Sequence, residues 1–179
     1  MFDNTVNPAP VRRRTAAMTA VAALAVSLTV TAPAEAADYV GTANLRNIET
    51  GLCLDSDFNG AVYARGCSAR NTNDHQLWQP ILLIRGNGVP GSNLQYDLVA
   101  LKNKATKRCL ALTGSNTLRT TLDCEEDAQE WSAQGLGWND VLFWKWSGST
   151  RYAVDGNRSG SVYAHPWNGG RYQRWNFDA

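Results

Sequence analysis

The chain has 179 residues, of which 17 are basic and 16 acidic, so its formal net charge is +1. This balance excludes the proteins that bind nucleic acid or an anionic membrane through a strongly basic surface. The one modest basic run, "LKNKATKR" at 101–108, fits a solvated strand edge and turn.

Residues 1–36 have the three parts of a secretory signal peptide. Arg12, Arg13 and Arg14 are followed by the uncharged segment "TAAMTAVAALAVSLTV" and then by "AEA", a small-x-small cleavage pattern before Ala37. The uncharged segment is shorter than the ~20 apolar residues that a membrane-spanning helix needs. We therefore expect a secreted protein, a mature single domain at 37–179, and no membrane contact after cleavage.

Alternating apolar and polar residues predict short strands throughout the mature chain. Examples are "GAVYARG" at 60–66, "YDLVALKN" at 96–103 and "VLFWKW" at 141–146. Gly, Asn, Asp and Ser separate these runs, and no segment sustains a helical stripe. The sequence therefore predicts an all-β protein.

The mature chain contains three related copies of one segment. "LRNIETGLCLDSD" at 45–57 resembles "LKNKATKRCLALT" at 101–113, and "STRYAVDGN" at 149–157 is a third, more divergent copy. We place the copies at about 39–83, 98–135 and 139–179, with a surface loop inserted at 84–97. Each copy ends on Gln-x-Trp, at Gln76 and Trp78, Gln129 and Trp131, and Gln173 and Trp175.

The Gln-x-Trp motifs predict a shared core. On a strand, the Gln and the Trp of each motif face the same side, so three indoles are expected to meet in one interior. Each buried glutamine amide then needs partners, most simply the backbone of a neighbouring turn. Three units that cannot bury a face alone close around a common axis, which predicts a β-trefoil.

The four cysteines of an exported chain indicate two disulfides, with three possible pairings. The second cysteine follows the first by fourteen residues in one copy and by fifteen in the next. The third copy has Ala153 and Trp167 at the matching positions, so both cysteines are missing together. This joint loss favours pairing within each copy, Cys53 with Cys67 and Cys109 with Cys124. Trp167 is a candidate to fill the place of the missing bridge.

The three Gln-x-Trp motifs, the Cys-Leu-Asp opening at 53–55 and the cysteine spacing resemble the ricin B-chain-like lectins, also called carbohydrate-binding module family 13, in an exported bacterial form. The resemblance covers about residues 39–177. It implies a β-trefoil with one shallow sugar site per copy, built from an Asp after Cys-Leu, an aromatic side chain and a polar residue before Gln-x-Trp. A carboxylate accepts hydrogen bonds from sugar hydroxyls, and an aromatic ring covers the apolar face of the sugar.

By this resemblance the third copy holds the best site. Asp155 takes the carboxylate position, His165 the stacking position, Tyr163 lies on the same side as His165, and Tyr172 stands where the family often has Asn. We expect these residues to form an outward-facing wall. Two structural alternatives remain, since Asp-Gly is a strong turn pair and His165 also fits a half-buried strand histidine.

The other copies match less well. The first keeps Asp55 and Tyr63 but has Arg65 at the stacking position, which implies a weaker second site. The second has Ala111 and Leu122 at the two positions, so we expect it to bind no sugar. For three further tryptophans we expect core and barrel-end packing rather than an aromatic binding platform: Trp138, Trp144 and Trp146.

We expect no enzymatic activity, no metal and no cofactor. The sequence has no metalloprotease or serine-nucleophile motif, and Glu125, Glu126 and Asp127 are adjacent in a polar turn rather than placed to flank a glycosidic bond. Two functions remain open. One is a weak lectin for galactose- or xylose-type glycans, and the other is a β-trefoil that has lost sugar binding and binds or inhibits a protein, for example through 84–97.

Overall fold

The computed structural model describes residues 40–69, 72–84, 86, 97–114, 116–124 and 127–178. The predicted signal peptide, Glu125, Glu126 and all of the 84–97 insertion except its residues 84, 86 and 97 lie outside the described residues. The described part is all-β, as predicted, with twelve strands and three short 3-10 helices. It contains no helix with the length and apolar character needed to cross a membrane.

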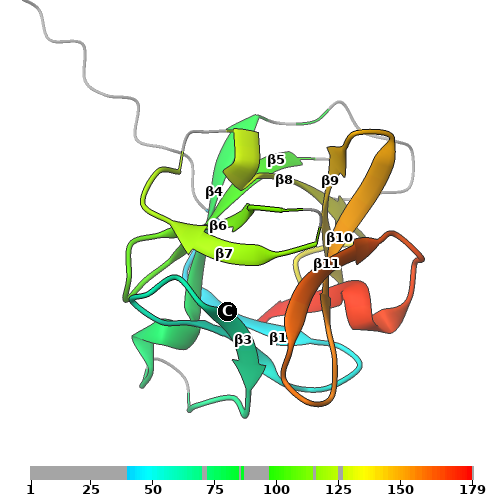
Figure 1. Cartoon of the computed structure of the whole chain (residues 1–179). Helices are drawn as coiled ribbons and strands as arrows, with labels where there is room; N and C mark the ends of the chain where they lie inside the picture. Colours follow the sequence, from blue (N-terminus) through cyan, green and yellow to red (C-terminus); the bar gives the residue numbers. More distant parts are fainter. Residues whose placement is uncertain are drawn as a thin grey trace, which may run out of the picture. The chain divides into compact units, whose positions relative to one another are not determined.

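Each predicted copy contributes four strands and one 3-10 helix (Figure 1). The first copy forms β1 (Ala43–Asn47), β2 (Cys53–Ser56), β3 (Val62–Arg65), η1 (Asp74–Gln76) and β4 (Leu77–Ile84). The second forms β5 (Asp97–Asn103), β6 (Cys109–Leu112), β7 (Leu118–Thr121), η2 (Asp127–Gln129) and β8 (Glu130–Gly135). The third forms β9 (Val141–Ser147), β10 (Thr150–Gly156), β11 (Val162–Pro166), η3 (Arg171–Gln173) and β12 (Arg174–Asp178).

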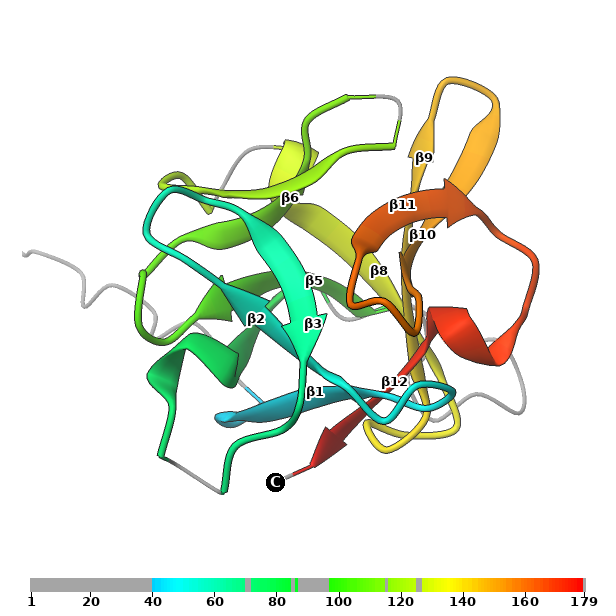
Figure 2. The same cartoon turned by 60° about the horizontal axis from the view of Figure 1, so that its bottom comes forward.

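Six of the strands close into a barrel. The antiparallel pairs run β1–β4, β4–β5, β5–β8, β8–β9 and β9–β12, and β12 returns to β1. The other six strands form three hairpins, β2–β3, β6–β7 and β10–β11, which lie side by side in both Figure 1 and Figure 2. This arrangement is the predicted β-trefoil.

The three hairpins are joined in a ring by a backbone hydrogen bond at each junction. The carbonyl oxygens of Gly60, Asn116 and Gly160 accept from the N–H groups of Thr120, Ala164 and Ala64, at 3.0, 2.9 and 2.8 Å. Gly160 has a φ of 87°, and a Cβ there would lie 2.5 Å from the carbonyl oxygen of Ala64. Glycine is therefore required where the hairpin backbones approach each other.

The predicted tryptophan core is confirmed. Trp78, Trp131 and Trp175 are fully buried, and each indole N–H donates to a strand carbonyl at 2.9 to 3.0 Å. The expected glutamine contacts hold in two copies. The Gln76 and Gln173 amides each accept from one backbone N–H and donate to one carbonyl, whereas the Gln129 amide donates to the Thr121 hydroxyl.

Both predicted disulfides are present, Cys53–Cys67 and Cys109–Cys124. In the third copy, Trp167 takes the chain position of Cys67, because each lies two residues after the residue paired with the first position of the bridge, His165 with Ala153 and Arg65 with Cys53. The backbone N–H of Trp167 donates to the carbonyl of Arg151 at 2.8 Å. Trp167 does not fill a buried space, however. Its side chain is 46% exposed and packs on Arg151, whose guanidinium carbon lies 4.8 Å from the Trp167 ring centroid.

The expectation for the other three tryptophans is confirmed for two of them. Trp138 packs against the core beside Phe143 and Phe177, and Trp144 is 7% exposed. The expectation is wrong for Trp146, which is 56% exposed. Trp146 lies near the end of β9, where the barrel no longer covers the strand.

Candidate functional site

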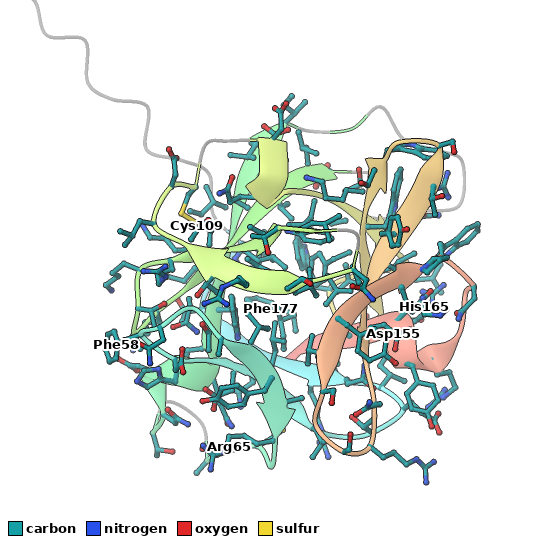
Figure 3. All side chains as sticks on the ribbon, in the orientation of Figure 1. Phe58, Arg65, Cys109, Asp155, His165 and Phe177 are labelled. Atoms are coloured by element: carbon teal, nitrogen blue, oxygen red, sulfur yellow. A yellow bond between two sulfur atoms is a disulfide. The ribbon has the colours of Figure 1, made fainter. Side chains whose placement is uncertain are left out.

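The register of the β10–β11 hairpin brings the third-copy residues together. Asp155 lies directly opposite Tyr163, and Ala153 lies opposite His165. Residues two apart on a strand and residues paired across it share one face of the sheet. Asp155, Tyr163 and His165 therefore stand on one face of the hairpin, on which Figure 3 labels Asp155 and His165.

Asp155 is less exposed than the sequence predicts. Only 5% of its surface is accessible, although His165 beside it is exposed. Burial raises the pKa of the Asp155 carboxyl above its ordinary value, and the Gln173 amide, His165 and the Tyr163 hydroxyl oppose this rise. Burial, and then the Asp155 carboxylate, likewise raise the pKa of the Tyr163 phenol. The acid thus forms the floor of the site rather than part of its outer wall.

The His165 ring belongs to the rim. Its Nδ1 lies 2.9 Å from the carbonyl oxygen of Pro166, so Nδ1 carries a proton and donates. The ring centroids of His165 and Tyr163 are 6.3 Å apart, with an angle of 72° between their planes. The alternative of a half-buried strand histidine does not hold, because the side chain is exposed.

The 3-10 helix η3 borders the site, because its Gln173 interacts with Asp155 and its Tyr172 with Tyr163. Its Tyr172 is 37% exposed, and the Asn47 amide of the first copy donates to the Tyr172 carbonyl at 2.7 Å. Glu49 accepts from Arg158 at 3.0 Å and from Arg171 at 3.1 Å, and these two hydrogen bonds lower the pKa of Glu49. A contact from another copy therefore fixes the segment that carries Tyr172.

The first copy repeats the arrangement. Asp55 lies opposite Tyr63 and is 1% exposed, and neither of its carboxylate oxygens has a hydrogen-bond partner among the described residues. Burial and the nearby Asp55 carboxylate raise the pKa of the Tyr63 phenol. Arg65 is exposed at the position that His165 has in the third copy.

Two aromatic side chains beside β2 of the first copy were not named from the sequence. His75 stands one residue before Gln-x-Trp, as Tyr172 does, and its Nδ1 lies 2.6 Å from the carbonyl oxygen of Ser56. The Phe58 ring meets the His75 ring edge-on at 5.0 Å. Counting back from the Gln-x-Trp motif would have found His75, since this count is the same in all three copies.

The second copy lacks the acid, as predicted, but the predicted stacking residue is wrong. The register places Arg119 opposite Ala111, and Thr121 rather than Leu122 opposite Cys109. This copy has one extra residue between its two cysteines, so counting back from Cys124 shifts the position by one. A shift of one residue moves a strand side chain to the other face.

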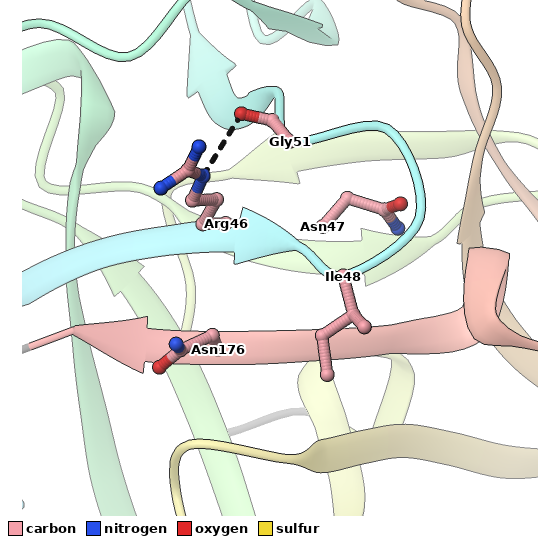
Figure 4. A pocket seen from close by; sticks show the side chains of 5 residues that line it. All are labelled: Arg46, Asn47, Ile48, Gly51 and Asn176. Atoms are coloured by element: carbon pink, nitrogen blue, oxygen red, sulfur yellow. Dashed lines mark hydrogen bonds between the residues drawn. The ribbon is translucent and has the colours of Figure 1, made fainter.

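A separate hollow of about 230 Å³ lies between the end of β1 and β12 (Figure 4). Its lining residues are Arg46, Asn47, Ile48, Gly51 and Asn176. Arg46 already donates from Nε to the carbonyl of Gly51 at 3.1 Å, and none of the predicted site residues lines this hollow, so we assign it no function. In the described part of the chain, no three His, Cys, Asp or Glu side chains gather as metal ligands would.

Comparison with known proteins defines the class of protein by fold. No family model and no curated protein sequence matches the chain. Among solved structures, it is similar to the crystal structure of a designed 3-fold symmetric protein, ThreeFoil, with a TM-score of 0.57 and 19% sequence identity. The match covers 77% of this chain and 99% of that one. At this identity the likeness shows the fold, and the chain is a β-trefoil protein.

Proposed function

We propose that this β-trefoil is a secreted lectin of the ricin B-chain-like type that binds galactose- or xylose-type sugar residues. Its main site is the third-copy site of Asp155, Tyr163, His165 and Tyr172, and it acts by binding rather than by catalysis. The weaker second site consists of Asp55, Tyr63 and Arg65, to which we add His75. The two disulfides are compatible with an extracellular location.

The observation that carries the proposal is a buried acid that the fold does not need. Asp55 and Asp155 are almost fully buried at a position where the second copy has Ala111, itself 0% exposed. Burying a carboxylate is costly unless hydrogen-bond donors meet it, and among the described residues Asp55 has only a weak interaction with the Tyr63 hydroxyl, which falls short of a well-formed hydrogen bond. Since alanine serves the same place in the fold, keeping the acid in two copies supports a ligand-binding role.

The surroundings of Asp155 suit a sugar. Sugar hydroxyls would donate to the carboxylate, while the exposed His165 and Tyr172 rings would cover the apolar face of the sugar. A site of this size buries little area, so the affinity should be near the millimolar end of the range. With one good site in the chain, tighter binding would require several copies of the protein on one glycan.

The test is calorimetric titration of the purified protein with galactose, xylose and their short oligomers. Asp155→Asn should weaken binding at least tenfold, by roughly 1.4 kcal/mol or more, and His165→Ala should weaken it as well. Asp55→Asn, the matched change in the weaker site, should have a smaller effect. Sugar binding that neither Asp155→Asn nor His165→Ala alters would refute this placement of the site.

Secretion has its own test. The mature protein recovered from the culture medium should begin at Ala37, as N-terminal sequencing would show. The interior of the 84–97 insertion, which the protein-binding alternative uses, lies outside the described residues.

A further inference from the structure

The face of the hairpin that carries the proposed sugar site continues beyond it. Arg151, Ala153 and Asp155 alternate along β10 and therefore point to the same side. Trp167 follows His165 by two residues, and the backbone N–H of Trp167 donates to the Arg151 carbonyl at 2.8 Å. Arg151 is thus about 13 Å along the strand from Asp155, with the exposed His165 between them.

Arg151 is the centre of a tryptophan–arginine cluster made of Arg151, Trp144, Trp146 and Trp167. The guanidinium carbon lies 4.2 Å from the ring centroid of Trp144, 4.8 Å from that of Trp167 and 5.2 Å from that of Trp146. Trp146 is paired with Arg151 across β9 and β10. The cluster therefore joins two strands to the segment that leaves β11.

A purely structural role explains only part of this cluster. It occupies the region where the other copies have a disulfide, and the buried Trp144 is suited to stabilise the third copy there. Trp146 and Trp167, by contrast, leave 56% and 46% of their surfaces exposed. Two half-exposed indoles held against one guanidinium are available to contact a ligand.

Arg151 also lacks the partner that other arginines of this copy have. Arg158, Arg171 and Arg174 each form a salt bridge with a carboxylate. Arg151 forms no salt bridge and donates no side-chain hydrogen bond to the residues described. A guanidinium held by aromatic rings is already oriented, and its N–H groups match the two oxygens of a carboxylate.

We propose that the tryptophan–arginine cluster is a subsite for an acidic sugar, so that the preferred ligand is an oligosaccharide containing a uronic acid. One sugar residue occupies the Asp155 site, and the chain continues past His165. The carboxylate of the uronic acid pairs with Arg151, while Trp146 and Trp167 contact its ring. This inference rests on the proposed function, because the Asp155 site fixes where the oligosaccharide begins.

The first test compares an acidic ligand with its own methyl ester on the unchanged protein. Suitable probes are trigalacturonate and a glucuronic-acid-substituted xylo-oligosaccharide, which are long enough to reach from Asp155 to Arg151, each beside the ester that has the same rings and linkages without the charge. We expect the acid to bind about tenfold more tightly than the ester, and the preference to decrease with added salt. Equal affinities for acid and ester would overturn the subsite.

Single-residue variants then test whether Arg151 causes the preference for the acid over the ester. Arg151→Lys keeps the charge but loses the fork of donors, so it should remove most of the preference for the acid while neutral oligomers still bind. Trp146→Ala should weaken both acid and ester. Arg46→Gln is the control for net charge, because Arg46 lies in the first copy and should change nothing. A loss of the preference for the acid in Arg46→Gln would show a general charge effect, and a full preference in Arg151→Lys would show that the Arg151 guanidinium does not hold the carboxylate. Either result would also overturn the proposal.

The result distinguishes this inference from the proposed function. Neutral sugars that bind in an Asp155-dependent way, without any preference for the acid, would leave the lectin function standing and remove the acidic subsite. Failure of every neutral and acidic probe to bind would remove both. The melting temperature of each variant checks that it is folded, and the comparison of acid with ester needs no variant.

Discussion

The indole N–H of Trp175 donates to the carbonyl oxygen of Val154 at 3.0 Å, directly before Asp155 in the chain. The core of the third copy and its proposed sugar site therefore share one stretch of backbone. Trp131 makes the same bond to Leu110 at 2.9 Å, directly before Ala111. The two copies thus have equal core contacts but differ in the acid.

This relationship predicts a separation of stability from binding. Trp175→Phe leaves the Val154 carbonyl unpaired and the core smaller, so it should cost about 2–4 kcal/mol of unfolding free energy and also weaken sugar binding. Trp131→Phe should cost a similar amount without affecting binding. Urea unfolding and sugar titration measure the two quantities. A loss of binding as large in Trp131→Phe as in Trp175→Phe would contradict the prediction.

The unpartnered carboxylate of Asp55 predicts a stabilising mutation. Asp55→Ala removes a buried acid that has only a weak interaction with the Tyr63 hydroxyl among the described residues, and Ala111 already fills the equivalent place. We expect a gain of about 1–3 kcal/mol in the free energy of unfolding. The reverse change, Ala111→Asp, should destabilise by a comparable amount. Urea unfolding of both variants checks this, and a less stable Asp55→Ala protein would argue against it.

The raised pKa of Asp155 predicts a pH dependence of stability. The folded state holds this proton more tightly than the unfolded state, whose aspartate pKa is about 4. The resulting stabilisation is complete below that pH and is lost as the pH rises through the higher folded pKa. Asp155→Asn should therefore gain stability relative to the wild type between about pH 4 and neutral pH.

Sugar binding should show the opposite trend, because the ionised carboxylate is the better acceptor. Affinity should fall as the pH decreases through the raised pKa of Asp155. Unfolding curves and sugar titrations across this range measure both effects. A stability difference between wild type and Asp155→Asn that does not change with pH would exclude the assignment.

The two disulfides and the tryptophan–arginine cluster should differ in their contribution to stability. Replacing Cys109 and Cys124 with alanine opens a loop of fifteen residues, at a cost of about 3 kcal/mol. Trp167→Ala removes a half-exposed ring from Arg151 and should cost only about 1 kcal/mol. Urea unfolding of the two proteins makes the comparison. Equal costs would mean that Trp167 stabilises the third copy as a disulfide does.

The fold was predictable because its Gln-x-Trp motif occurs three times in the sequence, and the disulfides were predictable because only two of the three copies carry cysteines. Each Gln-x-Trp motif fixes one buried indole, and the joint loss of both cysteines in the third copy identifies the pairing in the other two. The position of a residue within its copy was harder to assign where the copies differ in length. One extra residue before Cys124 was enough to replace Thr121 by Leu122 in the prediction.

The exposure of a side chain was harder to predict than the side of the sheet on which it lies. Alternation along β9 correctly puts Trp144 and Trp146 on one side, but only the three-dimensional arrangement shows that the first is covered and the second is not. Asp155 is similar. Its place opposite Tyr163 follows from the hairpin, whereas its burial depends on how η3 and the neighbouring strands pack around it.

The pairing of β1 with β12 has a consequence for how this protein is made. Residues 44–47 bond with residues 175–178, so the last strand must be available before the interior is sealed. Contacts between such distant segments form slowly, because the whole intervening chain must be organised first. A fragment that ends before β12 would leave β1 and β9 without their partner strand, so the barrel should close only after β12 has been synthesised.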